Sequence, residues 1–147
     1  MIFACRSEAK GRAAIDAVAA ATGNDDLELL PLDLTDLVQV REAARTLVAR
    51  GEPIHLLVAN AGVAAQRGVT AQGFELAFGV NHLAHFLFVT EVLPLLEAGS
   101  PAPDGAPARV VVVSSGSHYD AKKGVDFDAL RRPTASFSGM PEYAVSK

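Results

Sequence analysis

Short apolar runs alternate with longer amphipathic stretches along this chain, and this alternation limits the folds that it can adopt. The runs have the length of strands, whereas the stretches between them repeat apolar residues at helical spacing. Strands are expected at residues 2–4, 27–33, 54–59 and 110–113. Strands that alternate with helices in this way favour an open parallel sheet with helices on both faces. The sequence therefore predicts one doubly wound α/β domain over residues 1–147.

Residues that begin and end helices support this order of elements. Ser7 is expected to cap a helix over residues 8–21, which Gly23 ends. Thr35 is expected to cap a second helix, which Gly51 ends.

Three further expectations concern the remaining elements. Pro31 lacks an amide hydrogen, so its strand is expected at a sheet edge. A long, mostly apolar and well-buried helix is expected over residues 71–96, where Pro94 bends or ends it. The valine run 110–113 is typical of a parallel strand that is buried on both faces.

Composition excludes several classes of partner. The chain has 147 residues and a net charge of -4 without a basic run, so we expect no nucleic acid and no anionic membrane surface as partner. Cys5 is the only cysteine, which indicates the cytoplasm or another reducing compartment. No uncharged apolar run approaches the ~20 residues of a membrane helix, so no membrane segment is expected within this chain. The sequence does not decide whether a segment outside this chain anchors the protein to a membrane.

Tyr143 and Lys147 are four residues apart and share one face of a helix. An ammonium group beside a phenol favours the phenolate, which makes the tyrosine useful as a proton donor and acceptor. Ser115 follows the valine strand, at the sheet edge where ligands of such folds bind. Taken alone, the Tyr-x-x-x-Lys pair is also common on solvated helices.

Several ordered residues together give the chain a resemblance to a known family. Asn60-Ala61-Gly62, Asn81, Ser115, Tyr143 and Lys147 occur in the order found in short-chain dehydrogenases/reductases. Val80–Phe86 and Cys5–Ser7 look most like the retinol dehydrogenase branch. The resemblance implies a partial NAD(P)-binding Rossmann domain in an oxidoreductase that interconverts an alcohol and a carbonyl.

The resemblance also implies roles for four catalytic residues. Tyr143 would be the acid and base, Lys147 would assist it and hold the nicotinamide ribose, and Ser115 would orient the substrate oxygen. The family uses the residue that matches Asn81 to hold a water molecule. Without the resemblance, Ser115 is equally explained as a turn serine and Asn81 as a helix amide.

A second set of residues is expected to bind the cofactor, beside Tyr143 and Lys147. Small residues after a strand let the backbone approach a ligand, although an ordinary tight turn has the same sequence. Arg6 and Lys10 suit a 2'-phosphate, so NADP(H) is expected in preference to NAD(H), unless Arg6 is only a solvated surface charge. Asp33 resembles the family's acidic residue near the adenine; alternatively it is only a carboxylate near a helix start, before Thr35. The candidate cofactor residues are Arg6, Lys10, Asp33, Leu34, Asn60, Ala61 and Gly62.

His82 and His85 lie three residues apart in the long helix, but a zinc site needs at least three ligands. Packing or hydrogen bonding is expected of them, and no metal site is predicted.

The resemblance covers the whole chain but only the middle of the family's domain. The glycine-rich phosphate turn, the first strand and the last strands of the family pattern are missing. Because the first strand lies between strands 2 and 4 of the complete sheet, its loss is expected to leave two unpaired edges. The 147 residues alone are therefore expected to show no turnover.

Two explanations of this chain remain open. It is an oxidoreductase sequence given incompletely, which in its full-length form acts on a small lipophilic alcohol or carbonyl and allows a homo-oligomer. Alternatively, it is an inactive short product that acts as a binding or decoy segment through its open strand edges. A methyltransferase-like domain would explain the strand end at Asp33, but not Asn60, Tyr143 and Lys147 together.

Overall fold

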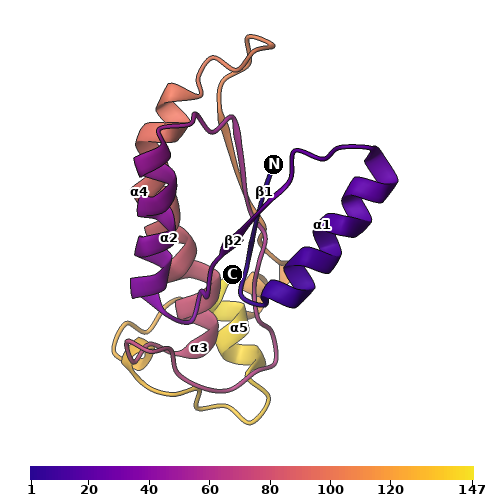
Figure 1. Cartoon of the computed structure of the whole chain (residues 1–147). Coiled ribbons are helices and arrows are strands. Elements are labelled where there is room, and N and C mark those ends of the chain that lie inside the picture. Colours follow the sequence, from indigo (N-terminus) through magenta and orange to yellow (C-terminus); the bar gives the residue numbers. More distant parts are fainter.

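The computed structural model describes residues 1–147 and has the predicted alternation of strands and helices. Helices lie on both sides of the strands: α2 and α4 pack together on one side and α1 lies on the other (Figure 1). The principal elements in chain order are β1 (Ile2–Cys5), α1 (Glu8–Thr22), β2 (Glu28–Pro31), α2 (Leu37–Arg50), β3 (Leu56–Ala59), α3 (Leu76–Phe78), a π-helical segment (Gly79–Ala84), α4 (His85–Ala98), β4 (Arg109–Val112) and α5 (Met140–Ser146). Two single 3-10 turns, Gly116–Asp120 and Ala129–Arg131, lie between β4 and α5.

The strands form two separate parallel pairs. β1 pairs with β2, with Ile2 opposite Glu28, and β3 pairs with β4, with Leu56 opposite Arg109. Neither β1 nor β3 has a second strand neighbour. The expected incomplete sheet with two open edges is therefore confirmed, and Pro31 lies in a strand with one neighbour.

The hydrophobic core lies on the α2 and α4 side of the strands. Val40 of α2 and Val92 of α4 are completely buried, and Leu30 of β2 packs in the same cluster as Val92. On the other side, α1 buries only Gly11, where a Cβ atom would lie 2.4 Å from Leu29 Cδ1. One side of the fold therefore carries most of the packing energy.

The prediction of a buried valine strand was wrong. All four residues of β4 are exposed, and Val112 is 65% exposed. β4 is hydrogen-bonded on one edge only and its faces are incompletely covered, so the apolar run does not reach a closed interior.

Two predicted helix starts also differ from the structure. Asp36, not Thr35, caps α2: its side chain accepts a hydrogen bond from the Val38 amide, while the amide and hydroxyl of Thr35 both donate to Asp33 Oδ1. The long helix begins at Leu76 rather than residue 71, because the Glu75 side chain caps it.

Pro94 lies inside α4 and does not end it; the helix continues to Ala98. This continuous helical stretch, Leu76–Ala98, has 23 residues and a mean hydropathy of 1.4, so length and composition alone would let it cross a membrane. Phe86 and Leu93 on it are exposed, so the helix is less buried than expected. Val92, Leu95 and Leu96 nevertheless pack in the core with α2, and core helices commonly meet the same test.

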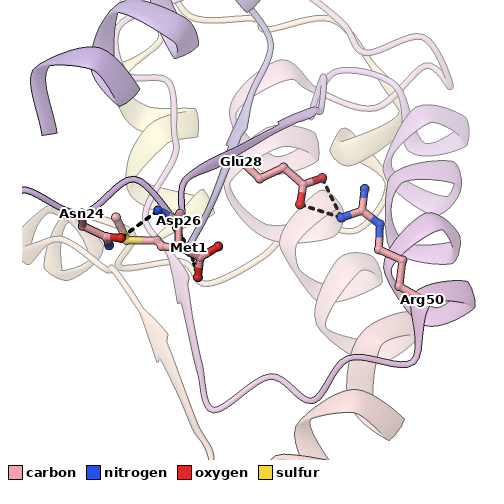
Figure 2. A network of polar contacts seen from close by, with 5 residues as sticks. All are labelled: Met1, Asn24, Asp26, Glu28 and Arg50. Carbon is pink, nitrogen blue, oxygen red and sulfur yellow. Dashed lines mark hydrogen bonds and ion pairs between the residues drawn. The ribbon is translucent and has the colours of Figure 1, made fainter. Parts of the chain in front are cut away.

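A surface network fastens the start of β2 (Figure 2). Arg50 Nη1, in the last turn of α2, lies 2.6 Å from one carboxylate oxygen of Glu28 and 2.7 Å from the other. The Asp26 amide donates to Asn24 Oδ1 at 3.0 Å in the turn before β2. Such a partly exposed ion pair contributes only about 0–1 kcal/mol.

We expect Val92→Ala to lower the free energy of unfolding by about 1–3 kcal/mol, because it leaves a cavity between α4 and α2. Val48→Ala makes the same chemical change in α2, where the side chain is 39% exposed, and should cost less than about 0.5 kcal/mol. Urea unfolding followed by circular dichroism measures both; equal losses would contradict the position of the core.

Candidate functional site

The Lys147 side chain lies where three segments of the chain meet. Its Nζ donates to the Val113 carbonyl at the end of β4, at 3.0 Å, and lies 5.9 Å from the centroid of the Tyr143 ring. A Cβ atom on Gly62, after β3, would lie 3.7 Å from the same nitrogen. The ammonium group is therefore surrounded by the phenol, the end of β4 and the loop after β3.

Ser115 lies directly after β4, on an element that packs against α5. Its Oγ accepts a hydrogen bond from the Ser117 amide at 3.2 Å and so caps the turn Gly116–Asp120. This turn contacts α5, and the neighbouring Ser114 Oγ donates to the Lys147 carbonyl at 2.8 Å. The elements that carry Ser115 and Tyr143 are thus side by side, as a shared proton-transfer site requires.

Asn81 joins the loop after β3 to α5 through a buried amide. Its Oδ1 accepts from the Val63 amide at 2.8 Å, and its Nδ2 donates to the Val63 carbonyl at 2.9 Å and to Ser146 Oγ at 2.8 Å. Ser146 Oγ in turn donates to the Tyr143 carbonyl at 2.7 Å. Both amide hydrogens are used within the protein, so any water would have to bind at the remaining lone pair of Oδ1.

Sequence reasoning overlooked Ser146. Its position three residues after Tyr143 and one before Lys147 was visible, but nothing in the sequence placed it against Asn81. Asn81 itself lies in the π-helical segment, a rare geometry that is frequent at functional sites.

His85, the first residue of α4, faces the same loop. Its Nε2 lies 2.8 Å from the Ala61 carbonyl oxygen. Burial lowers the pKa of His85 below its usual value; the hydrogen bond to Ala61 opposes this, and the charges of Lys147 and His82 lower the pKa further. The imidazole is therefore neutral at pH 7. Its ring is hydrogen-bonded to the backbone, and hydrogen bonding is one of the two roles expected for His82 and His85. The structure contains no group of three side chains that could ligate a metal.

The loop Asn60–Gly62 presents exposed backbone at the carboxyl end of β3. Any side chain at Gly62 would place its Cβ 2.8 Å from Asn81 Oδ1, closer than Cβ atoms are found in proteins. Only glycine lets the loop lie this close to Asn81.

The remaining candidate cofactor residues belong to the other strand pair. Arg6 and Lys10 follow β1, are exposed, and have no ion-pair partner. Asp33, after β2, uses Oδ1 to bind Thr35. The Leu34 side chain is buried in the core, so only its backbone is available to a ligand.

Two carboxylates hold the segment 116–139 against the helices. Glu75 is buried and accepts a hydrogen bond from Thr134 Oγ1 at 2.5 Å. Glu142, in the first turn of α5, accepts bonds from the Ser136 amide at 2.8 Å and from the Ser136 hydroxyl. Partial burial raises the pKa of Glu142, but these hydrogen bonds outweigh it and hold the pKa below its usual value.

An apolar cavity of about 380 Å³ lies outside this constellation. Its lining includes Phe78, His82 and Phe86 along one face of the long helix, and Ser115, Tyr143 and Lys147 do not line it. Ser115, Tyr143 and Lys147 are half-buried and lie elsewhere on the molecule.

Comparisons with known proteins agree on one family. Residues 1–125 match the sequence profile of a family described as short chain dehydrogenase. Polyprenol dehydrogenase of Mus musculus is 42% identical over 148 residues, covering 100% of this chain and 43% of that protein. Retinol dehydrogenase 13 of Homo sapiens is 35% identical over 148 residues, covering 100% of this chain and 42% of that protein. The chain thus spans less than half the length of these curated relatives.

A solved structure shares the fold at a similar level of identity. The crystal structure of an uncharacterized protein from Mycobacterium Paratuberculosis matches with a TM-score of 0.71 and 32% identity. The match covers 99% of this chain and 47% of that one. Together, the sequence and structural matches confirm an incomplete Rossmann-like α/β fold.

We expect Glu142→Gln to lower the free energy of unfolding by about 1 kcal/mol at pH 7, since a neutral amide is a weaker acceptor. Because folding lowers the pKa of Glu142, the ionised carboxylate stabilises the folded chain fully at pH values above its ordinary pKa of 4.5. This stabilisation is lost as the pH falls through the lower pKa of Glu142 in the folded state. The difference from the unmodified chain should therefore shrink below about pH 4.5 in urea titrations.

Glu52→Gln is the matched control, because Glu52 is exposed and has no hydrogen-bond partner; it should change little at any pH. A Glu142→Gln effect that stays constant down to pH 3 would refute the hydrogen-bonded carboxylate.

Proposed function

This chain belongs to the short-chain dehydrogenase family, and from that premise we propose that it carries the proton-transfer site of an NADP(H)-dependent oxidoreductase. The reaction interconverts an alcohol and a carbonyl by hydride transfer. The observation that carries the proposal is the position of Lys147, which contacts the end of β4 and lies near both Gly62 and the Tyr143 ring. The ends of β3 and β4, the Tyr143 phenol and the Lys147 ammonium group lie together at the edge where ligands of such sheets bind.

The residues present fit a nicotinamide dinucleotide. The exposed loop Asn60–Gly62 approaches Asn81 so closely at Gly62 that a Cβ atom there would clash with Oδ1, so the loop presents bare backbone at this position. Asn60, Ala61 and Gly62 would hold the cofactor by backbone contact, and Lys147 would hold its ribose. When bound, the cofactor supplies or accepts the hydride.

Tyr143 moves the proton. In reduction its hydroxyl donates to the substrate's carbonyl oxygen, and in oxidation the phenolate takes the proton back. The Lys147 Nζ lies 5.9 Å from the centroid of the Tyr143 ring, on the same helix face. Ser115 Oγ orients the substrate oxygen beside the phenol, and Asn81 holds α5 against the loop after β3.

The preference for NADP(H) rests on charge. Arg6 and Lys10 are exposed at the carboxyl end of β1 without a carboxylate partner, and the uncharged Cys5 precedes them. Two free cations attract a 2'-phosphate, and a guanidinium group can bind it with two hydrogen bonds. Asp33 and the Leu34 backbone would lie near the adenine.

The substrate is a lipophilic alcohol or carbonyl compound. The names of the polyprenol and retinol dehydrogenases support this class, and the loop residues Val63, Ala64 and Ala65 are small and apolar. The single cysteine, Cys5, supports a reducing compartment.

A binding segment without catalysis is the second candidate. Its support is the pair of open strand edges, with Leu56 and Val58 of β3 exposed. Such an edge can accept an added strand from another chain.

The first test is carbonyl reduction by this chain joined to the flanking segments of mouse polyprenol dehydrogenase. Tyr143→Phe should lower kcat by about 100-fold or more, because the proton donor is lost. Tyr119→Phe is the control, since Tyr119 is 76% exposed, and it should retain activity. Turnover that survives Tyr143→Phe would refute the acid-base role, and no turnover with a broad panel of carbonyls would favour the binding segment.

Cofactor choice is tested with Arg6→Asp in the same joined protein. The new carboxylate repels a 2'-phosphate, so the ratio of kcat/KM for NADPH to that for NADH should fall about tenfold or more. Arg109→Asp, at the opposite end of the strands, should leave the ratio unchanged. An unchanged ratio in Arg6→Asp would contradict the preference for NADP(H).

A further inference from the structure

The His85 ring connects α4 to the loop expected to contact the cofactor. Nε2 lies 2.8 Å from the Ala61 carbonyl oxygen, which can only accept a hydrogen bond. Nε2 must therefore carry the proton, and in the neutral ring Nδ1 is the unprotonated nitrogen. The catalytic roles of Tyr143, Lys147 and Ser115 do not explain this contact.

His85 acts together with Asn81, one helical turn earlier. Asn81 binds both backbone groups of Val63, and His85 binds the carbonyl of Ala61. Two side chains of one helix face thus fasten the loop on either side of Gly62. The His85 bond acts directly on the Ala61–Gly62 peptide through its carbonyl, whereas the Asn81 bonds hold the following residue, Val63.

Burial, more than the nearby charges, lowers the pKa of the His85 ring. Lys147 of α5 and His82 of the same helix are the titratable groups that act on it, and both are basic. The β3 loop contributes Asn60, Ala61 and Gly62, none of which is ionisable. A neutral imidazole has a single N–H group, and this group donates its hydrogen bond to the Ala61 carbonyl.

His82, three residues earlier, shows the contrast. Its ring lies between Phe78 and Phe86, with centroids 5.0 Å and 6.4 Å away, and it has no hydrogen-bond partner. The two histidines of this helix thus face different surroundings, one aromatic and one polar.

We propose that His85 is a positioning residue of the cofactor site, whose neutral imidazole holds the Ala61 carbonyl and so fixes the backbone of Asn60–Gly62 against which the nicotinamide dinucleotide binds. This inference rests on the proposed function. His85 touches neither the substrate nor the transferred proton; it acts through the loop.

The test uses nuclear magnetic resonance on this chain joined to the flanking segments of mouse polyprenol dehydrogenase, the same joined protein as in the activity tests, titrated with NADPH and NADH to millimolar concentrations. The Gly62 amide reports on the bond, because it shares a peptide plane with the Ala61 carbonyl. Long-range nitrogen correlations of the imidazole should show the neutral form with the proton on Nε2 at pH 7. His85→Phe should shift the Gly62 amide and weaken NADPH binding by about three- to tenfold, the effect of one lost hydrogen bond.

His85→Gln is the conservative variant, because its amide nitrogen can reach the same carbonyl. It should restore both the Gly62 signal and most of the NADPH affinity. His82→Phe is the matched control and should change neither.

Each result decides a separate point. NADPH binding to His85→Phe at wild-type affinity, or a failure of Gln to restore it, would overturn the positioning role while leaving the proposed function in place. Wild-type protein that binds neither NADPH nor NADH would overturn the cofactor site and the role of His85 with it. If His85→Phe does not fold, a ring protonated on Nδ1 alone in the unmodified chain would still refute the proposal.

Discussion

The buried amide of Asn81 is the contact on which the site's geometry depends. It is the one side chain that binds both the loop after β3 and, through Ser146, the helix that carries Tyr143 and Lys147. A buried amide without partners costs more free energy than one hydrogen bond returns, so its three bonds constrain one another. If the loop moved by an ångström, Asn81 would lose its hydrogen bonds to Val63, and the distance between Gly62 and Lys147 would change. The phenol, ammonium and loop therefore keep a common geometry because one polar group must be satisfied.

The two strand pairs supply different parts of the proposed site, and helices rather than strand hydrogen bonds connect them. Arg6 and Asp33 lie at the ends of β1 and β2, whereas Gly62 and Ser115 follow β3 and β4. The first cluster of the core joins Leu30 of β2 to α2 and to Val92, Leu95 and Leu96 of α4, with Leu57 of β3 packed against it. The distance from Arg6, proposed to bind the 2'-phosphate, to the proposed proton-transfer residues is therefore set by the packing of α2 on α4. A cavity in that core would disturb cofactor binding as well as stability.

The sequence predicted the local structure well, because local structure follows from periodicity and capping chemistry. Ser7 caps α1, Gly23 and Gly51 end their helices, and the split of the sheet follows from the strand order. Burial was predicted less well. The valines of β4 have the composition of a buried strand, but burial depends on which neighbours are present, and composition does not contain that information. The hydrogen bonds of His85 and Ser146 could not be predicted from the sequence either, because each joins residues that become neighbours only after folding.

The polar contacts favour a site over a segment that merely lends its strand edges. Strand addition needs only free backbone groups and apolar side chains, which β1 and β3 already offer. It does not require a buried Asn81, a Glu75 enclosed with Thr134, or a glycine pressed against an amide oxygen, all of which carry a desolvation or conformational cost. Asn81 and Gly62 lie at the loop after β3, and Glu75 and Thr134 hold the segment before α5. A fold that accepts such costs in one place holds its backbone there in a defined geometry. The proposed oxidoreductase site requires such a geometry, whereas strand addition does not.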